Sequence, residues 1–488
     1  ETRVEATPGL LSWTGTAGRV DLAYESPDTV RLRGTGLGFG ISAAAPALTP
    51  FSGIYFYRDP VDGAHTFTSY ETGRRYRITV LSGTVAEVSG SQALGAGDRG
   101  LTVAAGADGS WEVAVEELDS ARRPYRTSAA FGEVMEAARR SFAEFADAVA
   151  PWRSADTPAA ELAAYVVWSA TVRPAGLVTR PAGSPELAWD QFHLPFDHQD
   201  ESGALPDSVT HSEVLYNFVK PPIHGWTFGH LRRRLPEPLT PAQLNEAYDR
   251  LTRWTDFWLA ARRAPGAELP HYQHGNDSGW DNATTFDPAR VAVTADLAAF
   301  LTLQLRELAR LATELDLPDE ARHWTRTADA TQAAMLDELW TGERFVARGV
   351  DSTATWDSSS LLDLMPMALG EHLPENIGKT LAARIETHLT PYGLATEQPA
   401  SPHYLADGYW RGPIWAPATV LIEDGLRRAG HQRLADDISA RFRALCEAHG
   451  FAENFDALTG TGLRDRAYTW TASSYLLLAE AHAHRDSR

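Results

Sequence analysis

Five segments of the chain combine large aromatic side chains with acidic, basic and histidine side chains. Such residues can act on a bound ligand, for which a sugar is one good candidate, because carboxyl groups transfer protons and flat aromatic rings stack on sugar rings. Loops on a rigid scaffold are the usual place for such residues. The segments are WDQFHLPFDHQD (189–200), KPPIHGWTFGH (220–230), HGNDSGWDNATTF (274–286), DGYWRGPIWAP (407–417) and FAENFDALTGTGLRDRAYTWTASS (451–474).

Carboxyl groups in two of these segments are candidates for acid and base catalysis. Hydrolysis of a glycoside with inversion needs one protonated carboxyl, which gives its proton to the leaving oxygen, and one carboxylate, which activates a water. Asp277 and Asp281 lie in the third segment, and Glu453, Asp456 and Asp465 lie in the fifth. Carboxyl groups are abundant in this chain, so residue type alone leaves the choice among these five open.

The histidines and the single cysteine do not predict a metal site or a disulfide. His193, His198, His224 and His274 follow no spacing that is typical of zinc ligands, so we expect no metal. Cys446 stands alone in an apolar-periodic helix, and the usual role of such a residue is that of a small buried hydrophobe.

The composition is that of a soluble globular protein. The chain has 488 residues, of which 43% are hydrophobic, and its formal net charge is -20. This negative field repels nucleic acid and anionic lipid, and no apolar run reaches the roughly 18 residues that a membrane helix needs. We expect a small carbohydrate as the partner, a monomer or homodimer, and a cytoplasmic location. The chain begins at Glu1, so a removed leader stays open as an alternative.

Hydrophobic periodicity divides the chain into two regions. Residues 1–118 alternate apolar and polar side chains in short runs, which predicts an all-β, sandwich-like domain. Residues 119–131 carry charge and proline and are interpreted as a linker. Residues 132–488 show helical periodicity in about twelve segments. A closed ring of helix pairs would hold these helices and gather alternate loops at one end, although periodicity does not prove closure.

The ordered motifs resemble those of a known family. SGWDNA, YWRGPIW and ENFDALTGTGLRDRAYTWTAS resemble, in that order, signature segments of glycoside hydrolase family 63 and its relatives, which include bacterial mannosylglycerate and glucosylglycerate hydrolases and the trehalases of family 37. WDQFH resembles the early Trp-Asp segment of the family, and KPPIHGW resembles its Gln-Pro-Pro segment. The resemblance covers about 189–480. It implies an all-α (α/α)6 toroid as the catalytic domain, inverting cleavage of α-glycosides and no cofactor.

The resemblance also selects residues. It places the general acid on Asp281 and the general base on Glu453. The substrate-binding residues that we expect are Asp190, Gln191, Trp226, Asp277, Trp280, Trp410, Arg411, Trp415 and Trp470. Each has a plainer alternative: the tryptophans could pack in the core, Arg411 could form a surface salt bridge, and Asp277 could only hold the turn before Gly279, which is the role that we favour.

Three positions depart from the family pattern or lie outside it. Asp277 stands where the family often has Glu, and Lys220 replaces the Gln of Gln-Pro-Pro. Lys220 could meet an anionic group such as a glycerate carboxylate, or point to water. Glu397, in LATEQPASPHY, is a further candidate for a sugar contact, with no support from a motif.

The sequence therefore favours an exo-acting, inverting α-glycosidase for a small α-glucoside or α-mannoside: a disaccharide, an oligosaccharide or a glycosylglycerate. Two other hypotheses remain: a sugar isomerase or epimerase on the same toroid, and a non-catalytic carbohydrate-binding protein. The β-rich region is expected to shape the entrance of the site or to support dimerisation.

Overall fold

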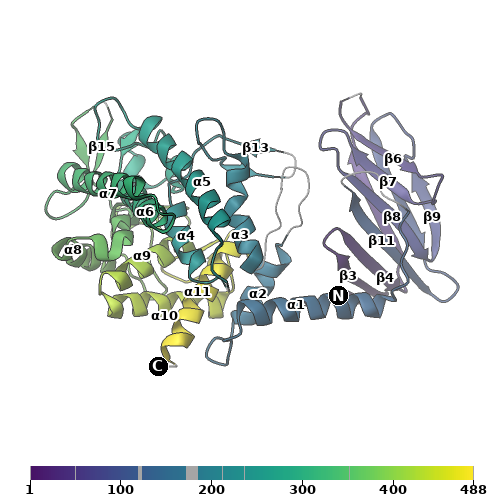
Figure 1. Cartoon of the computed structure of the whole chain (residues 1–488). Coiled ribbons are helices and arrows are strands. Elements are labelled where there is room, and N and C mark those ends of the chain that lie inside the picture. Colours follow the sequence, from purple (N-terminus) through teal and green to yellow (C-terminus); the bar gives the residue numbers. More distant parts are fainter. Residues whose placement is uncertain are drawn as a thin grey trace. The chain divides into compact units, whose positions relative to one another are not determined.

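The computed structural model describes residues 2–49, 51–118, 124–171, 185–210, 213–235, 237–350 and 352–486. These residues form two compact units (Figure 1). Among the described residues, those up to Ala148 belong to the first unit and those from Val149 belong to the second.

The first unit contains two antiparallel sheets. The larger sheet has eight strands in the order β1-β2-β3-β4-β11-β8-β7-β6, and the smaller has three in the order β5-β10-β9. The strands are β1 (Arg3–Thr7), β2 (Leu10–Gly15), β3 (Gly18–Ser26), β4 (Thr29–Thr35), β5 (Phe39–Ala45), β6 (Ile54–Arg58), β7 (His65–Ser69), β8 (Arg75–Ser82), β9 (Thr84–Ser89), β10 (Gly97–Ala104) and β11 (Ser110–Leu118).

Side chains from both sheets share one hydrophobic core. Phe56, Ile78 and Trp111 come from the larger sheet, and Leu101 and Val103 come from β10 of the smaller sheet. Alternate residues of a strand point to opposite faces, which is why the alternating pattern of the sequence buries one face of each sheet. The predicted β-rich, sandwich-like region is confirmed.

The rest of the chain is mainly helical. Its α-helices are α1 (Phe131–Val149), α2 (Ala160–Ser169), α3 (Pro185–His193), α4 (His224–Arg232), α5 (Pro241–Ala260), α6 (Ala295–Glu314), α7 (Pro318–Leu339), α8 (Glu375–Glu386), α9 (Ala416–Arg428), α10 (Gln432–His449) and α11 (Thr469–Asp486). Between α7 and α8 lies the 3-10 segment η4 (Leu361–His372), which contains Pro366 and is kinked at Gly370. A proline removes a helical hydrogen bond, so an α-helix is disfavoured there.

The domain boundary stays a prediction. The sequence placed the helical domain from residue 132, which falls at the start of α1, whereas α1 groups with the strands of the first unit. Of the predicted linker 119–131, residues 119–123 lie outside the described residues, and residues 124–130 have no regular secondary structure.

The helices of the second unit close into a ring. Neighbouring helices pack in sequence, as α5 does on α6 and α6 on α7, and the last helix α11 packs against α2, the first helix of this unit. Ala163 and Val166 of α2 share a buried cluster with Tyr475 and Leu478 of α11. This contact supplies the closure that periodicity alone could not establish.

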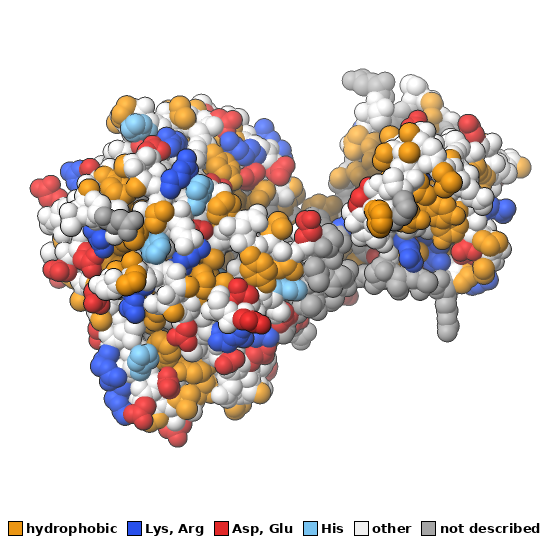
Figure 2. All heavy atoms as spheres, turned by 90° about the horizontal axis from the view of Figure 1, so that it is seen from above, with side chains coloured by type: hydrophobic (Ala, Val, Ile, Leu, Met, Phe, Trp, Pro, Cys, Tyr) orange, Lys and Arg blue, Asp and Glu red, His pale blue; other side chains and the backbone are white. Residues whose placement is uncertain are grey.

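The described helices include none that is long and apolar enough to cross a membrane. On the face of the molecule seen in Figure 2, acidic and basic side chains are interspersed among polar and apolar ones. The net negative charge is thus not gathered into one acidic patch on that face.

Gly425 of α9 is required by a close approach to η4. A Cβ at this position would lie 2.2 Å from the carbonyl oxygen of Met367, whereas a Cβ at Gly378 of α8 would meet nothing closer than His431 Nε2, at 3.8 Å. We expect Gly425→Ala to lower the free energy of unfolding by about 1–3 kcal/mol, because backbone has to move. The control Gly378→Ala should raise it by about 0.5–1 kcal/mol, because alanine is the better helix former. Urea denaturation followed by circular dichroism measures both, and equal effects of the two variants would contradict this packing.

Candidate active site

The segment that carries Asp281 is a tight turn stabilised by its own side chains. The 3-10 helix η2 (Gly275–Ser278) begins after His274, whose ring nitrogen Nδ1 accepts a hydrogen bond from the Asn276 N–H (3.1 Å). Gly279 then adopts a left-handed conformation with φ 75°, which glycine does at little cost. The Trp280 N–H donates to Ser278 Oγ at 3.0 Å. Asp281 therefore follows a turn whose backbone is fixed.

Asp277 holds this turn in place and is fully occupied by protein groups. Its side chain is buried and pairs with Arg262 at 2.8 Å. It also accepts hydrogen bonds from the backbone N–H groups of Gln273 (2.8 Å) and Val219 (3.2 Å). This geometry is that of a structural residue, which is the role that the sequence favoured. Through its bond to Val219, Asp277 also connects the turn to the segment of Lys220.

Asn282, next to Asp281, joins the segment that carries Asp281 (residues 274–286, the acid segment) to the loop that precedes α9. Its side-chain amide donates to the carbonyl of Gly408 (3.0 Å), and its side-chain oxygen accepts from the N–H of Trp410 (3.0 Å). Arg411 donates to the carbonyl of Asn282 (2.7 Å) and forms an ion pair with Asp287. Arg411 thus forms the salt bridge that was its alternative role, and this salt bridge joins the two segments.

The segment that carries Glu453 (residues 451–474, the base segment) is joined to the other side of the same loop. Strand β17 (Asn454–Phe455) pairs with β18 (Gly462–Leu463) in a hairpin. Phe455 and Ile414 exchange backbone hydrogen bonds of 2.7 and 3.1 Å, and the Glu453 N–H donates to the carbonyl of Asp465 at 2.8 Å. Residues 408–414 therefore hold the acid segment on one side and the base segment on the other.

Asp456 and Asp465, the other carboxyl candidates of this segment, have different surroundings. Asp456 accepts hydrogen bonds from the Leu458 N–H and the Thr459 hydroxyl, as a turn-forming residue does. Asp465 is exposed, and its backbone fixes Glu453. Glu453 is half-buried and directly precedes β17 of the hairpin.

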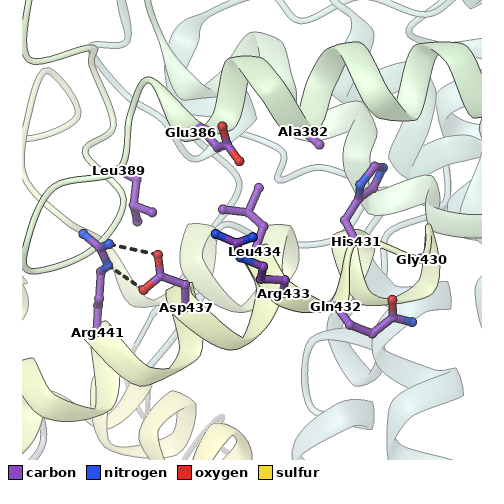
Figure 3. Close-up of a pocket in the computed structure, with 10 residues that line it drawn as sticks. All are labelled: Ala382, Glu386, Leu389, Gly430, His431, Gln432, Arg433, Leu434, Asp437 and Arg441. Carbon is purple, nitrogen blue, oxygen red and sulfur yellow. Dashed lines mark hydrogen bonds and ion pairs between the residues drawn. The ribbon is translucent and has the colours of Figure 1, made fainter.

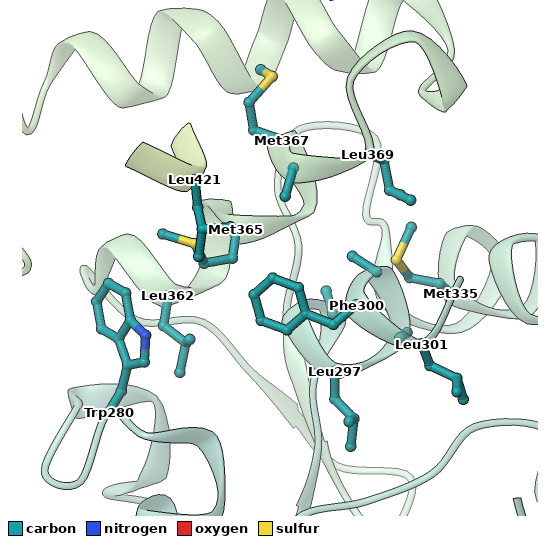
Figure 4. Close-up of a cluster of buried hydrophobic side chains, with 14 of the residues drawn as sticks. Trp280, Leu297, Phe300, Leu301, Met335, Leu362, Met365, Met367, Leu369 and Leu421 are labelled. Atoms are coloured by element: carbon teal, nitrogen blue, oxygen red, sulfur yellow. The ribbon is translucent and has the colours of Figure 1, made fainter. Parts of the chain in front are cut away.

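Four tryptophans form a continuous array from the acid segment to the base segment. The ring centroids are 4.5 Å apart for Trp280 and Trp410, 4.1 Å for Trp410 and Trp415, and 5.3 Å for Trp415 and Trp470. Trp470 Nε1 donates to the carbonyl of Glu453 at 3.1 Å. Trp280, which precedes Asp281, belongs to the main buried cluster together with Leu362 (Figure 4).

The exposed fractions of the four rings differ, and a ring without exposed surface can support the site but has little surface to offer a ligand. Trp415 is completely buried, and Trp280 and Trp410 are 7% and 4% exposed. Trp470 is only half-buried. The three buried rings are placed to support the two carboxyl segments, and their predicted contact with substrate stays a prediction.

The pKa of the Tyr409 phenol is affected by both candidate carboxyl groups. Burial raises the pKa of its phenol, and the negative charges of Asp281 and Glu453 raise this pKa further. Tyr409 adopts a positive φ of 63°, which is strained for a non-glycine residue. The guanidinium of Arg464 lies 5.1 Å from the centre of its ring. Asp281 and Glu453 are distant in sequence, and the fold brings both within electrostatic reach of one phenol.

The surroundings of Asp281 favour its protonated form. Burial is the largest cause that raises the pKa of Asp281, and the carboxylate of Asp207 adds to it, while the Lys220 ammonium acts against it. Lys220 itself pairs with Asp207 at 3.1 Å and donates to the carbonyl of Asn276 at 3.0 Å. A carboxyl with a raised pKa is what general acid catalysis needs.

The pKa of Glu453 is raised as well: burial is the largest cause, and the charge of Asp465 adds to it. The Arg464 guanidinium acts against this rise and so favours the ionised form that a general base requires. Arg464 in turn contacts Asp407 (2.7 Å) and the Asn454 side chain (3.1 Å).

The other three predicted substrate-binding residues are on α3 and α4. Asp190 and Gln191 are on α3, which contacts α4. Trp226, on α4, donates to Asp424 Oδ2 at 3.0 Å. Asp424 lies nine residues after Trp415, about 14 Å along α9 at the usual helical rise. Trp226 is therefore placed in the packing of α4 on α9.

The sequence reasoning missed Asn282, Tyr409 and Asp207. Asn282 and Tyr409 belong to two recognised motifs. Their residue types did not show that Asn282 binds the backbone of residues 408–410, or that Tyr409 lies near both carboxyl groups. Asp207 lies outside every motif, so no signal pointed to it.

Two surface hollows flank different parts of the helical unit. A pocket of about 470 Å³ is lined by residues 465–469 of the segment that carries Glu453. A larger one, of about 920 Å³, lies between α8 and α10 and is lined in part by the Asp437–Arg441 ion pair (Figure 3). None of the residues that line the larger hollow belongs to the five motif segments, so only the smaller one adjoins the candidate site.

Within the described ranges, no group of three or more His, Cys, Asp or Glu side chains could hold a metal ion. His224 is half-buried and packs against aromatic rings, and its burial lowers its pKa to about 4.

Comparison with known proteins agrees with the fold and the motifs. Residues 164–471 match the domain described as mannosylglycerate hydrolase MGH1-like glycoside hydrolase. The mannosylglycerate hydrolase of Rubrobacter radiotolerans is 26% identical over 367 residues, which are 62% of this chain and 82% of the relative.

Two solved structures show the same fold. The GH63 mannosylglycerate hydrolase from Thermus thermophilus in complex with glucose has a TM-score of 0.57 and 20% identity, covering 65% of this chain and 99% of that one. A bacterial glucoamylase complexed with acarbose has a TM-score of 0.63 and 10% identity, covering 99% of this chain and 85% of that one. These likenesses support the (α/α)6 toroid with its preceding β-rich region.

The site and the fold define a carbohydrate-cleaving enzyme of the toroid class. The chain belongs to the MGH1-like glycoside hydrolase family, because the family domain covers more than half of its residues. It is therefore a glycoside hydrolase, and the hypotheses of an isomerase and of a non-catalytic binding protein are set aside.

The charges around Asp281 predict a shift in the pH dependence of activity. Lys220→Met removes a positive charge that lowers the pKa of Asp281, so this pKa should rise. The alkaline limb of kcat/KM, which reports loss of the acid's proton, should then move to higher pH. Asp207→Asn should move it to lower pH, because the charge that it removes raises this pKa. Lys220→Arg, which keeps the charge, is the control. A limb that stays in place in both charge variants would show that Asp281 does not set it.

Proposed function

We propose that this chain is an exo-acting, inverting α-glycosidase in which Asp281 is the general acid and Glu453 is the general base. The observation that supports the proposal is the loop of residues 408–414, which hydrogen-bonds to Asn282 beside Asp281 and to Phe455 beside Glu453. Both carboxyl groups also raise the pKa of Tyr409 in this loop. Both groups are half-buried and follow backbone segments that are fixed by hydrogen bonds.

The chemistry follows from the two carboxyl groups. Asp281 gives its proton to the glycosidic oxygen as the bond from the anomeric carbon to that oxygen breaks, and the alcohol leaves. Glu453 accepts a proton from a water as the water oxygen bonds to the anomeric carbon from the opposite face. The products are one alcohol and one sugar of inverted configuration, with the acid now ionised and the base protonated. Exchange of protons with solvent restores both.

The substrate that we propose is a small α-mannoside or α-glucoside. Relatives with substantial coverage are mannosylglycerate hydrolases, and mannosylglycerate carries a carboxylate. Lys220, whose side chain is 39% exposed, lies close enough to Asp281 to lower its pKa. A cation beside the acid is on the side of the leaving group, so a glycerate carboxylate is a suitable partner for Lys220.

Variants of the two carboxyl groups should fail in different ways. Asp281→Asn removes the proton donor, so kcat for an α-glycoside with an alcohol leaving group should fall by about 10²–10⁴-fold. The matching α-glycosyl fluoride should remain a substrate, because fluoride leaves with little help from an acid. Glu453→Gln should lose both activities, because the attacking water is no longer activated.

Small anions give a second test of the base. With Glu453→Ala, azide should restore cleavage of the α-glycosyl fluoride and yield a β-glycosyl azide, since azide attacks without giving up a proton. Mannosylglycerate, trehalose and their fluorides are the substrates to compare. Unchanged turnover of a true substrate by both Asp281→Asn and Glu453→Gln would refute the assignment.

A further inference from the structure

Glu397 is a buried carboxyl group that the proposed reaction does not use. Its side chain has no exposed surface. Its two oxygens accept hydrogen bonds from the hydroxyl of Thr284 (2.7 Å) and from the hydroxyl of Ser401 (2.6 Å). A sugar contact, which the sequence left open, does not fit a carboxyl group that is enclosed and occupied on both oxygens.

Thr284 connects Glu397 to the segment of the general acid. It begins the 3-10 helix η3 (Thr284–Phe286), three residues after Asp281, and is itself buried. The next residue, Thr285, donates its hydroxyl to Asp363 at 2.8 Å. Adjacent hydroxyl groups of the acid segment are thus held by carboxyl groups from two other parts of the chain.

Glu397 is a rigid anchor because its own backbone is fixed. It pairs with Ser360 in a short antiparallel bridge. The N–H of Gln398 donates to the carbonyl of Ser359 at 3.0 Å, and the N–H of Leu361 donates to the carbonyl of Thr396 at 2.7 Å. A side chain on such a bridge has little freedom, so its bond to Thr284 fixes position as well as adding energy.

We propose that Glu397 is a positioning residue for the general acid, and that it acts through the Thr284 hydroxyl to fix the direction of Asp281. This inference rests on the proposed role of Asp281. A hydrogen bond to a carboxylate is stronger than one between neutral groups. Proton delivery depends on placement, since an error of about 1 Å costs about 10²-fold in rate.

Thr284→Val and Thr284→Ser form the matched pair that tests the hydroxyl. Valine keeps the shape of threonine without the donor, and serine keeps the donor. For an α-glycoside with an alcohol leaving group, we expect Thr284→Val to lower kcat by about 10–100-fold with a smaller change in KM. For the α-glycosyl fluoride, which needs little acid assistance, the loss should be below about threefold. Thr284→Ser should remain close to the unaltered protein on both substrates.

Ser401→Ala separates positioning from stability. It removes a hydrogen bond of similar length to the same carboxyl group without touching the acid segment. It should lower the thermal midpoint without a loss that depends on the leaving group. Equal losses of Thr284→Val on glycoside and fluoride, or no loss on either, would overturn the inference.

A double-variant cycle tests the pair itself. The quantity compared is the loss of kcat on the glycoside with an alcohol leaving group, relative to the loss on the fluoride. If Glu397 acts through Thr284, this loss in the double variant Glu397→Gln/Thr284→Val should not exceed that of the more damaging single variant, because the two substitutions remove the same interaction. Losses that multiply would show independent action and would contradict the proposal. Asp281→Asn is measured alongside: if it keeps full activity on the glycoside, the proposed function fails. If it behaves as expected and Thr284→Val does not, only this inference fails.

Discussion

The loop of residues 408–414 is held on both sides by backbone contacts, and the relation of the two carboxyl groups depends on it. On one side, Asn282 binds the backbone of Gly408 and Trp410 through both ends of its amide. On the other side, Ile414 exchanges two backbone hydrogen bonds with Phe455. Backbone hydrogen bonds tolerate little change in length or angle, so the acid and base segments are set by the same short stretch of chain. The stacked tryptophans pack along this stretch.

Buried polar groups reinforce that arrangement. Burying them costs free energy, and ion pairs and hydrogen bonds with neighbouring groups reduce this cost. Asp277 is buried against Arg262, which neutralises it. Asp363 has hydroxyl and amide donors, and burial raises its pKa to about 7, with the charge of Asp296 adding to the shift. An unpaired buried charge is expensive, and hydrogen bonding lowers the cost only in part. Asp277 and Asp363 hold residues on both sides of Asp281, at Gln273 and Thr285.

Much of the fold was predictable because it follows from periodicity. Alternation in the first 118 residues buries one face of each sheet, and helical periodicity from Gly132 onward matches helices such as α10 and α11. Closure of the ring was not predictable in this way, because the packing of α11 on α2 depends on residues separated by most of the helical unit. The position of the domain boundary relative to α1 likewise depends on tertiary contacts.

The candidate site shows the same division. Motif order selected Asp281 and Glu453, and Asp277 was favoured as a structural residue from its place before a glycine turn. The supporting roles of Asn282 and Tyr409 depend on which backbone and which charges lie opposite them, and residue type does not encode that. Trp226 illustrates the reverse case, since a tryptophan in a recognised motif is directed to Asp424 in the packing of two helices.

The central claim is that the bond of an α-glycoside is cleaved by direct attack of water between Asp281 and Glu453. Proton NMR of the first minutes of hydrolysis, on α-mannosylglycerate and on α,α-trehalose, tests this claim directly, because it observes the anomeric proton of the newly released sugar before mutarotation. Inversion predicts that mannose from α-mannosylglycerate appears first as the β anomer, and that α,α-trehalose yields α- and β-glucose in equal amounts, because the leaving glucose keeps its α configuration. First appearance of α-mannose, or of α-glucose alone from trehalose, would show retention through a covalent intermediate and would contradict direct attack of water.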